Sequence, residues 1–309
     1  MKRLAFCVTV LGLLVSLMLP VNAVDHEATL KSLRAEIAAN NYTYTVKYSP
    51  VCDIPIDELC TLKPQWAAAS DIMLADDSGW EQPGPGNLAE VQTQDAPPSL
   101  LPSVYSGYCG PVGNQGACGS AWAFASIAAI ESAFGDTCGW SLNFSENWMI
   151  DCNSSGYGCA GGWFYFPDPY DCTIPLEGGY NGDCDDLSGP LYEISGAAYV
   201  FGYPSPSVSN IKSAIYNYGG VAAGVYVNSA FQYYSSGCFT ACSNRTVNHA
   251  ILLCGWDDSK CSSTGAWRLK NSWGTAWGES GFMWIKYGCS RVGYAACYAT
   301  VVCGDNPCN

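Results

Sequence analysis

The sequence predicts an α+β domain in two lobes, because a helical front half is followed by a sheet-forming back half. The front half contains one run, residues 119–134, that is apolar nearly all round and typical of a buried helix. The back half contains five short β-prone runs separated by Gly, Ser and Asn: "GVAAGVYV", "HAILLCGW", "AWRLKNSW", "GFMWIKYG" and "YATVV". Helix and sheet are therefore expected to occupy successive halves of the domain.

The predicted helix carries small residues at helical spacing on one face: Ala121, Ala125, Ala128 and Ser132. Other elements can approach a helix closely along such a face, so we expect tight packing there. We expect the helix to end near Gly135.

The N-terminus predicts a signal peptide over residues 1–23. Lys2 and Arg3 precede the apolar run Leu4–Leu19, and small residues lead up to Ala23. An apolar run of this length is short for a membrane span. We therefore expect no membrane span in the mature chain and a route through the secretory pathway, to a secreted or a lysosomal or vacuolar destination.

Two further regions differ in composition. Residues 24–96 contain a short helical pattern and then, over 81–99, a run rich in Pro, Gly and polar residues, which predicts a pro-segment joined to a linker. From about residue 97 the chain is dense in Gly, Trp, Tyr and Cys, so residues 97–309 form the main domain.

Charge and cysteine content limit the partners and the compartment. The formal net charge of −14 argues against nucleic acid or an acidic membrane as partner. Eighteen cysteines indicate an oxidising compartment, and 17 remain once Cys7 leaves with the signal peptide. An odd number requires a free or intermolecular thiol, for which buried Cys254 is the expected candidate. Four asparagines begin N-x-S/T sequons and are candidates for glycosylation: Asn41, Asn143, Asn153 and Asn244.

Three segments carry the chemistry. The start of a buried helix suits a thiolate, because free amide groups and the helix dipole favour negative charge there. Gln115 lies in a Gly-rich turn just ahead of the predicted helix and can supply an oxyanion donor. The chain has two histidines, and the one in the main domain, His249, begins the run "HAILLCGW". A histidine at the start of a strand is more often structural, so its spacing from the other motifs decides the interpretation.

Four segments, in order and at family spacing, resemble the papain family of cysteine peptidases: "PVGNQGACGSAWAFA", "SENWMIDCNSSGYGCAGG", "VNHAILLCGW" and "KNSWGTAWGESGF". His249 follows Ala121 by 128 residues and Asn271 follows it by 150, close to the His and Asn spacing of that family. The resemblance covers about residues 97–300 and implies a papain-like fold, with a helical lobe, a β-barrel-like lobe and a cleft between them.

The resemblance also implies roles for individual residues. Gln115 matches the oxyanion-hole glutamine, His249 the general base and acid, Asn271 the residue that orients the imidazole, and Trp273 the indole that shields this pair. Gly161 and Gly162 match the wall that binds substrate as an extended strand. The pocket for the second substrate side chain is expected to include Gly162, Gly224, Ala250 and Val302. No metal or other cofactor is expected, since the cysteines and histidines lack the paired spacing of a zinc site.

Ala121 departs from the family pattern, because it stands at the nucleophile position and a methyl group cannot attack a carbonyl. Neighbouring Cys118 matches a structural half-cystine, and Ser120 has no base in line with it. Loss of the nucleophile in a comparable triad lowers turnover by about 10⁶. As written, the chain is predicted to be inactive as a peptidase.

Four disulfides are implied by the resemblance: Cys118–Cys159, Cys152–Cys184, Cys242–Cys297 and, as in the cathepsin B branch, Cys109–Cys138. Cys52 and Cys60 are close enough in sequence to close a small loop, and Cys303 and Cys308 can tie the tail.

Three function classes fit these observations. The first is a papain-type endopeptidase zymogen that has lost its nucleophile, and the second is a pseudo-peptidase that binds peptides or peptidase inhibitors without cleavage. The third is a structural or storage protein that uses only the disulfide-rich fold. The expected partners are extended peptide or protein substrates and protein inhibitors of cysteine peptidases, and the expected state is a monomer.

Overall fold

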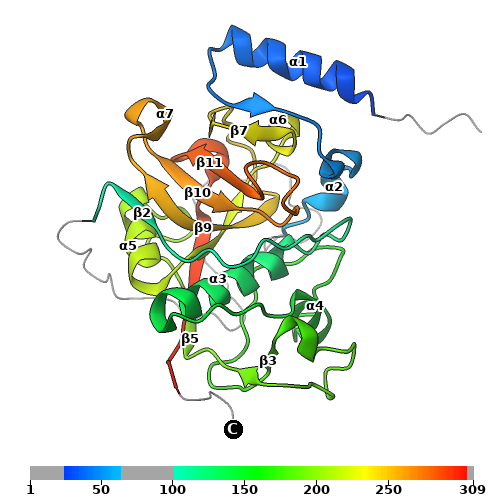
Figure 1. Ribbon diagram of the computed structural model, residues 1–309, viewed down its shortest axis with the longest axis vertical. Coiled ribbons are helices and arrows are strands. Elements are labelled where there is room, and N and C mark those ends of the chain that lie inside the picture. Colours follow the sequence, from blue (N-terminus) through cyan, green and yellow to red (C-terminus); the bar gives the residue numbers. More distant parts are fainter. Residues whose placement is uncertain (1–23, 64–100, 305–309) are drawn as a thin grey trace, which may run out of the picture.

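The computed structural model describes residues 24–63 and 101–304. The predicted signal peptide, the linker over 81–99 and Cys308 lie outside these residues. The described part shows the expected combination of helix and sheet, arranged around two buried clusters of apolar side chains. Figure 1 shows the long helix α3 lying below the main sheet, with α4 and β3 beneath it.

Helix α3 spans Ala121–Cys138. It begins two residues after the start of the predicted helix, 119–134, and ends four residues after its end. Its small face is buried and packs against β9, β12 and β6. Gly135 does not end the helix: it lies inside it, where the Tyr108 ring occupies the space that a side chain would need. The helix ends instead at Gly139, which adopts the left-handed conformation (φ 69°) that glycine tolerates best.

The back half forms an eight-stranded sheet in the order β5-β12-β6-β9-β10-β11-β8, with β2 pairing to β9. All five predicted β-prone runs contribute a strand to it. The strands are β2 Val104–Ser106, β5 Gly196–Tyr199, β6 Val221–Val225, β8 Cys238–Phe239, β9 His249–Asp257, β10 Ala266–Lys270, β11 Phe282–Lys286 and β12 Tyr294–Thr300. Strand β9 is central and buried along nearly its whole length, which explains its unbroken apolar sequence.

Short elements complete the main domain. They are α4 Glu146–Cys152, β3 Ile174–Pro175, η2 Glu177–Gly179, β4 Leu191–Tyr192, α5 Val208–Tyr218, α6 Ser229–Gln232, β7 Tyr234–Ser236, α7 Lys260–Ser263 and η3 Cys289–Arg291. Helix α5 covers the sheet beside α3, and α4 packs on α3.

The region before the linker is folded against the β-rich lobe. It comprises α1 His26–Ala39, β1 Thr45–Val46, η1 Pro50–Asp53 and α2 Ile56–Leu59. Strand β1 pairs antiparallel with β7, and α1 lies above this pair in Figure 1. Leu30, Leu33 and Tyr44 are buried in the same cluster as Phe231 and Trp277 of the main domain. The segment is therefore part of the β-lobe core.

Six disulfides join described residues: Cys109–Cys254, Cys118–Cys159, Cys138–Cys303, Cys152–Cys184, Cys238–Cys261 and Cys242–Cys289. Two of them, Cys118–Cys159 and Cys152–Cys184, are the pairs implied by the resemblance. This number of bridges fits folding in an oxidising compartment.

Two implied pairings were wrong. Cys242 bonds to Cys289 rather than Cys297, because η3 brings Cys289 to it while Cys297 lies fully buried on β12 as a free thiol. Cys109 bonds to Cys254 rather than to Cys138, because it follows β2, which pairs with β9, the strand that carries Cys254.

Two further cysteine predictions also failed. Cys254, expected to be a free thiol, is bonded to Cys109. Cys52 and Cys60 close no loop, since both are buried free thiols. Cys303 bonds to Cys138 at the end of α3 and so ties the tail to the domain, as expected.

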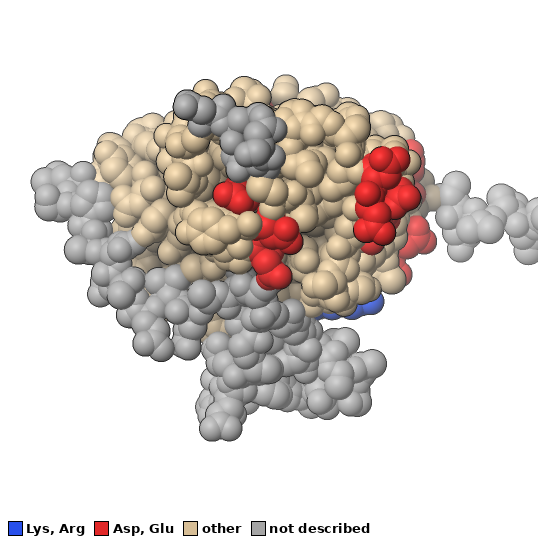
Figure 2. Space-filling model, turned by 90° about the horizontal axis from the view of Figure 1, so that it is seen from below, with Lys and Arg blue, Asp and Glu red and all other residues tan. Residues whose placement is uncertain are grey.

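Negative charge is concentrated in the helical lobe. The sequence contains no Lys or Arg between Lys63 and Lys212, and the loop with Asp183, Asp185 and Asp186 is exposed. Figure 2 shows Asp and Glu gathered on the face seen from below, with basic groups only at its rim. Among the described residues, no helix combines the length and apolar character that a membrane crossing requires.

Candidate active site

Three elements bring the predicted catalytic positions together. Ala121 is the first residue of α3, His249 the first of β9, and Asn271 directly follows β10. Strands β9 and β10 are neighbours in the sheet, and α3 packs against β9. All three residues are buried, with exposed fractions of 2% or less.

The His249–Asn271 pair has the geometry expected of an oriented imidazole. His249 Nε2 lies 2.8 Å from Asn271 Oδ1, and the backbone N–H of Ser272 donates to the same oxygen at 2.8 Å. Because a backbone N–H can only donate, the oxygen of Asn271 must face it. His249 Nε2 must then carry the proton of the neutral ring, which leaves Nδ1 as a bare acceptor.

No donor meets that acceptor. His249 Nδ1 is buried and has no hydrogen-bond partner. The same is true of Asn271 Nδ2 and Trp273 Nε1. Burial lowers the pKa of His249 to about 4, against which the bond to Asn271 acts weakly. Trp273 packs on the imidazole with ring centroids 4.9 Å apart and is itself 4% exposed. The imidazole is thus neutral, oriented and sealed from water.

Gln115 is held in place by the chain around it. Its Nε2 donates to Leu59 O at 3.0 Å and to Cys118 O at 2.9 Å, and its Oε1 accepts from Ser272 Oγ at 2.6 Å. Its backbone N–H also donates to Ser272 O. A carbonyl, that of Leu59, therefore already occupies the position in front of the Gln115 amide.

The chain that follows Leu59 continues along the backbone of Gly161 and Gly162. Leu62 forms a parallel bridge with Gly162, Lys63 N donates to Gly162 O at 2.9 Å, and Leu62 N donates to Asn248 O at 3.0 Å. At Gly161 (φ 109°) any side chain would collide with the carbonyl oxygen of Thr61. Residues 59–63, here called the cleft segment, thus fill the site, from the last residue of α2 to the β-bridge of Leu62 and the backbone bond of Lys63.

The residues predicted to form the substrate pocket differ in burial. Leu62 is buried in a cluster that includes Ala250 and Val247, and Val247 lies against Gly224. Val302 is wrong, because it is 66% exposed, whereas Val301 is 9% exposed and belongs to the cluster.

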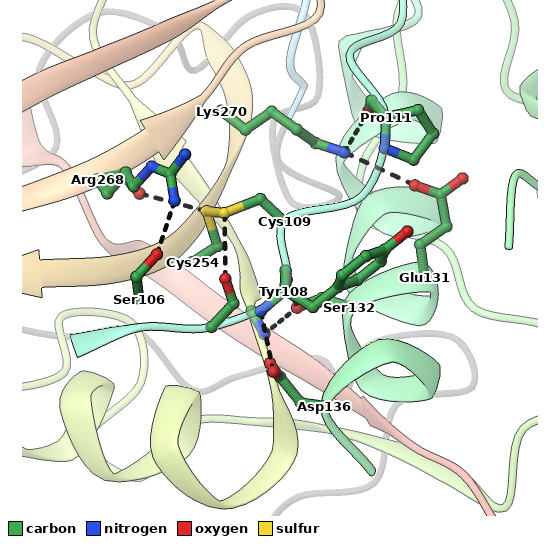
Figure 3. The surroundings of a disulfide bond; sticks show 12 residues. Ser106, Tyr108, Cys109, Pro111, Glu131, Ser132, Asp136, Cys254, Arg268 and Lys270 are labelled. Atoms are coloured by element: carbon green, nitrogen blue, oxygen red, sulfur yellow. Dashed lines mark hydrogen bonds and ion pairs between the residues drawn. A yellow bond between two sulfur atoms is a disulfide. The ribbon is translucent and has the colours of Figure 1, made fainter. Parts of the chain in front are cut away.

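A buried ion pair anchors β10, the strand that Asn271 directly follows. Lys270 Nζ lies 3.6 Å from Glu131 Oε2 and donates to Pro111 O at 2.7 Å. Burial raises the pKa of Glu131 and lowers that of Lys270, and each charge opposes the shift of the other. Figure 3 shows Lys270 reaching toward Pro111 and Glu131 beside the Cys109–Cys254 disulfide.

The predicted glycosylation sites differ in accessibility. Asn41, Asn143 and Asn244 are exposed. The amide nitrogen of Asn153, which a glycan would require, donates to the carbonyl groups of Met149, Ile150 and Tyr157. In the described ranges no cluster of three or more His, Cys, Asp or Glu side chains is placed to hold a metal ion.

Sequence reasoning missed the cleft segment and Ser272. The segment lies in a region without periodicity, and its contacts span about 60 to 190 positions. Ser272 was visible inside the quoted motif "KNSWG", between Asn271 and Trp273, and a buried hydroxyl at that position was the available signal.

Fold and site together define a two-lobed, papain-like α+β fold. The model of the papain family of cysteine proteases matches residues 101–302, and the chain belongs to this family. Fruit bromelain of Ananas comosus is 32% identical over 213 residues, covering 63% of this chain and 58% of its own length. Cathepsin K of Gallus gallus is 34% identical over 207 residues, covering 64% and 61%. The chain thus spans less than two thirds of these relatives.

Solved structures agree on the fold. The proform of the ragweed pollen protease Amb a 11 superposes with a TM-score of 0.70 at 23% identity, covering 89% of this chain and 86% of its own. Bromelain from Ananas comosus in complex with the inhibitor E64 gives a TM-score of 0.56 at 28% identity, covering 65% and 100%.

Proposed function

We propose that this protein is a papain-family zymogen fold that does not act as a thiol peptidase as written and whose cleft binds extended peptides. The cleft segment carries this proposal. A stretch of ordinary peptide already uses the Gln115 amide, the backbone of Gly162 and an apolar pocket, and none of these contacts requires a thiol. A site that holds its own segment in this way offers the same groups to another peptide.

The loss of peptidase activity rests on the absence of a substitute nucleophile. Cys118 is bonded to Cys159 and cannot form a thiolate. Ser120 Oγ is buried and has no partner, so no base withdraws its proton. His249 is a base with nothing to deprotonate.

A second candidate function is binding of a peptidase inhibitor. Relatives at 28% and 30% identity have been solved with E64 or E-64 in place. The groups of this chain that would hold the backbone of such a ligand are present, although the bond to sulfur cannot form. A purely structural or storage role does not require an oriented His249–Asn271 pair. The protein is further proposed to be a monomer that is secreted or delivered to a lysosome or vacuole.

Calorimetry tests the proposal. The full chain is folded with its disulfides, cut at an inserted protease site within residues 64–100, and freed of residues 24–63. A peptide with a bulky apolar residue at the position that fills the Leu62 pocket should bind with a Kd of about 1–100 μM, since ordering a short peptide offsets much of the contact energy. The same peptide with glycine there should bind at least tenfold more weakly.

A synthetic peptide covering residues 24–63 provides the control. Its rebinding, with recovery of the original melting temperature, shows that the domain is still folded. If this peptide rebinds and neither test peptide binds at millimolar concentration, the peptide-binding proposal is wrong and the structural role gains support.

A further inference from the structure

A small cavity lies beside Asn271, among α3, α4 and the end of β10. Ala125 and Ala128 of α3 form part of its wall, and their short side chains leave room for about one water molecule. Two charged residues also line it, Glu146 from α4 and Lys270 from β10. The cavity therefore connects the carboxyl group of Glu146 with the amide of a residue of the candidate site.

The amide nitrogen of Asn271 is available to a molecule in this cavity. Asn271 Oδ1 already accepts from His249 Nε2 and from the backbone N–H of Ser272, both at 2.8 Å. Asn271 Nδ2 is the other end of the same amide, and it is buried without a partner among the described groups. A buried donor left unpaired is unfavourable, so a small acceptor beside it would stabilise the orientation of the amide.

Glu146 carries the charge that this part of the molecule leaves uncompensated. Lys270 Nζ lies 3.6 Å from Glu131 Oε2 and donates to Pro111 O at 2.7 Å. Within the described ranges Glu146 forms no ion pair. Burial raises the pKa of Glu146 to about 7, the negative charge of Glu177 adds to this shift, and Lys270 opposes it. The carboxyl group is thus available to bond a molecule in the cavity.

We propose that the cavity binds a water molecule, which accepts a hydrogen bond from Asn271 Nδ2 and donates one to the carboxyl group of Glu146. Glu146 is then a positioning residue that acts on the His249–Asn271 pair through this water. The ammonium group of Lys270 has three N–H donors and bonds Pro111 and Glu131, so it can supply a third hydrogen bond. A buried water usually has two to four polar partners.

The mixed polarity of the cavity selects water over other small ligands. The amide donor and the ammonium group disfavour a cation, and the carboxylate disfavours an anion. An apolar molecule would leave both Asn271 Nδ2 and Glu146 unpaired. The proposal concerns the closed full chain, so it does not rest on the peptide-binding function.

The bridge makes the amide of Asn271 sensitive to the ionisation of Glu146. A carboxylate accepts strongly from the water and polarises the chain of hydrogen bonds that ends at Asn271 Nδ2, whereas a protonated carboxyl group is a weaker acceptor. The charged and titratable groups that face Glu146 are Glu131 on α3, Lys270 on β10 and Glu177 on η2. A pH-dependent change at Asn271 that follows Glu146, and none of these three groups, is therefore the signature of the bridge.

Nuclear magnetic resonance of the full chain tests the proposal. The side-chain amide protons of Asn271 should show a cross-relaxation peak with a long-lived water, and their chemical shifts should change with pH around a midpoint of about 7. Glu146→Gln should abolish this pH step and keep the water peak, since glutamine does not titrate but still accepts a hydrogen bond. Glu146→Leu should lose both signals.

Glu177→Gln is the matched control, because it removes a neighbouring carboxylate that does not line the cavity. The step should remain and move to lower pH, since the charge of Glu177 raises the pKa of Glu146. An Asn271 amide without a water peak in the folded wild-type protein would overturn the proposal. A pH step that persists in Glu146→Gln would also overturn it, because another group, such as Glu131, would then be responsible. If Glu146→Leu does not fold, these two results decide the matter.

Discussion

Replacing Glu146 with glutamine should stabilise the protein at neutral and alkaline pH and leave it nearly unchanged below pH 4.5. Glu146 begins α4 and is half-buried, and burial raises its pKa from 4.5 to about 7. The negative charge of Glu177 adds to the shift, while Lys270 opposes it. The folded protein therefore holds this proton more tightly than the unfolded chain does.

The sign and size follow from linkage. When the folded pKa of an acid exceeds the unfolded one, stability falls as pH rises between the two values, here from about 4.5 to about 7. The difference between these two pKa values corresponds to about 3 kcal/mol of lost stability above pH 7. That pKa already includes the favourable contact of the carboxylate with the first turn of α4, and solvent screening of this partly exposed group leaves an expected net gain on substitution of about 2–3 kcal/mol.

Chemical denaturation at pH 4, 5.5, 7 and 8 measures this effect. The wild-type curve should fall by about 2–3 kcal/mol relative to Glu146→Gln across this range. Glu36→Gln makes the same chemical change on an exposed carboxylate and controls for the loss of one charge. If the difference between Glu146→Gln and wild type is the same at pH 4 and pH 8, the raised pKa is not present and the reasoning is refuted.

Two other predictions concern packing and thiols. Gly135→Ala should destabilise the protein by about 1–3 kcal/mol because the new methyl group meets the Tyr108 ring, although alanine is the better helix former by about 1 kcal/mol; a stabilised variant in thermal unfolding would contradict this contact. Cys52, Cys60 and Cys297 should resist a thiol reagent in the native protein and react in denaturant, since all three are buried free thiols and burial raises the pKa of each. Rapid reaction of the native protein would show that they are exposed.

Runs of apolar residues in the sequence correctly predicted individual helices and strands. The helix at α3 and the strand at β9 were identified from runs of apolar residues. The prediction that the helix ends near Gly135 was wrong, because this glycine does not form a turn. It lies within α3, where the absence of a side chain lets the Tyr108 ring pack close to the helix. Nothing in the neighbouring sequence could reveal that contact.

Partners distant in sequence could not be predicted in the same way. Cys289 and Cys297 are equally plausible mates for Cys242 along the chain, and only the position of η3 separates them. The positions of His249 and Asn271 were found because they belong to short motifs with characteristic spacing. The cleft segment has no such motif, and its presence in the site depends on the packing of α1 and β1 against the β-rich lobe.

The central claim is that one missing sulfur atom separates this site from a working thiol peptidase. Labelling of Ala121→Cys by the epoxide inhibitor E-64, followed by mass spectrometry after removal of residues 24–63, tests it most directly. We expect labelling of one site, at position 121, together with cleavage of hydrophobic peptides. Ala121→Ser, and the unmodified chain treated identically, should remain unlabelled. A folded Ala121→Cys protein that neither takes up the label nor cleaves peptides would contradict the claim.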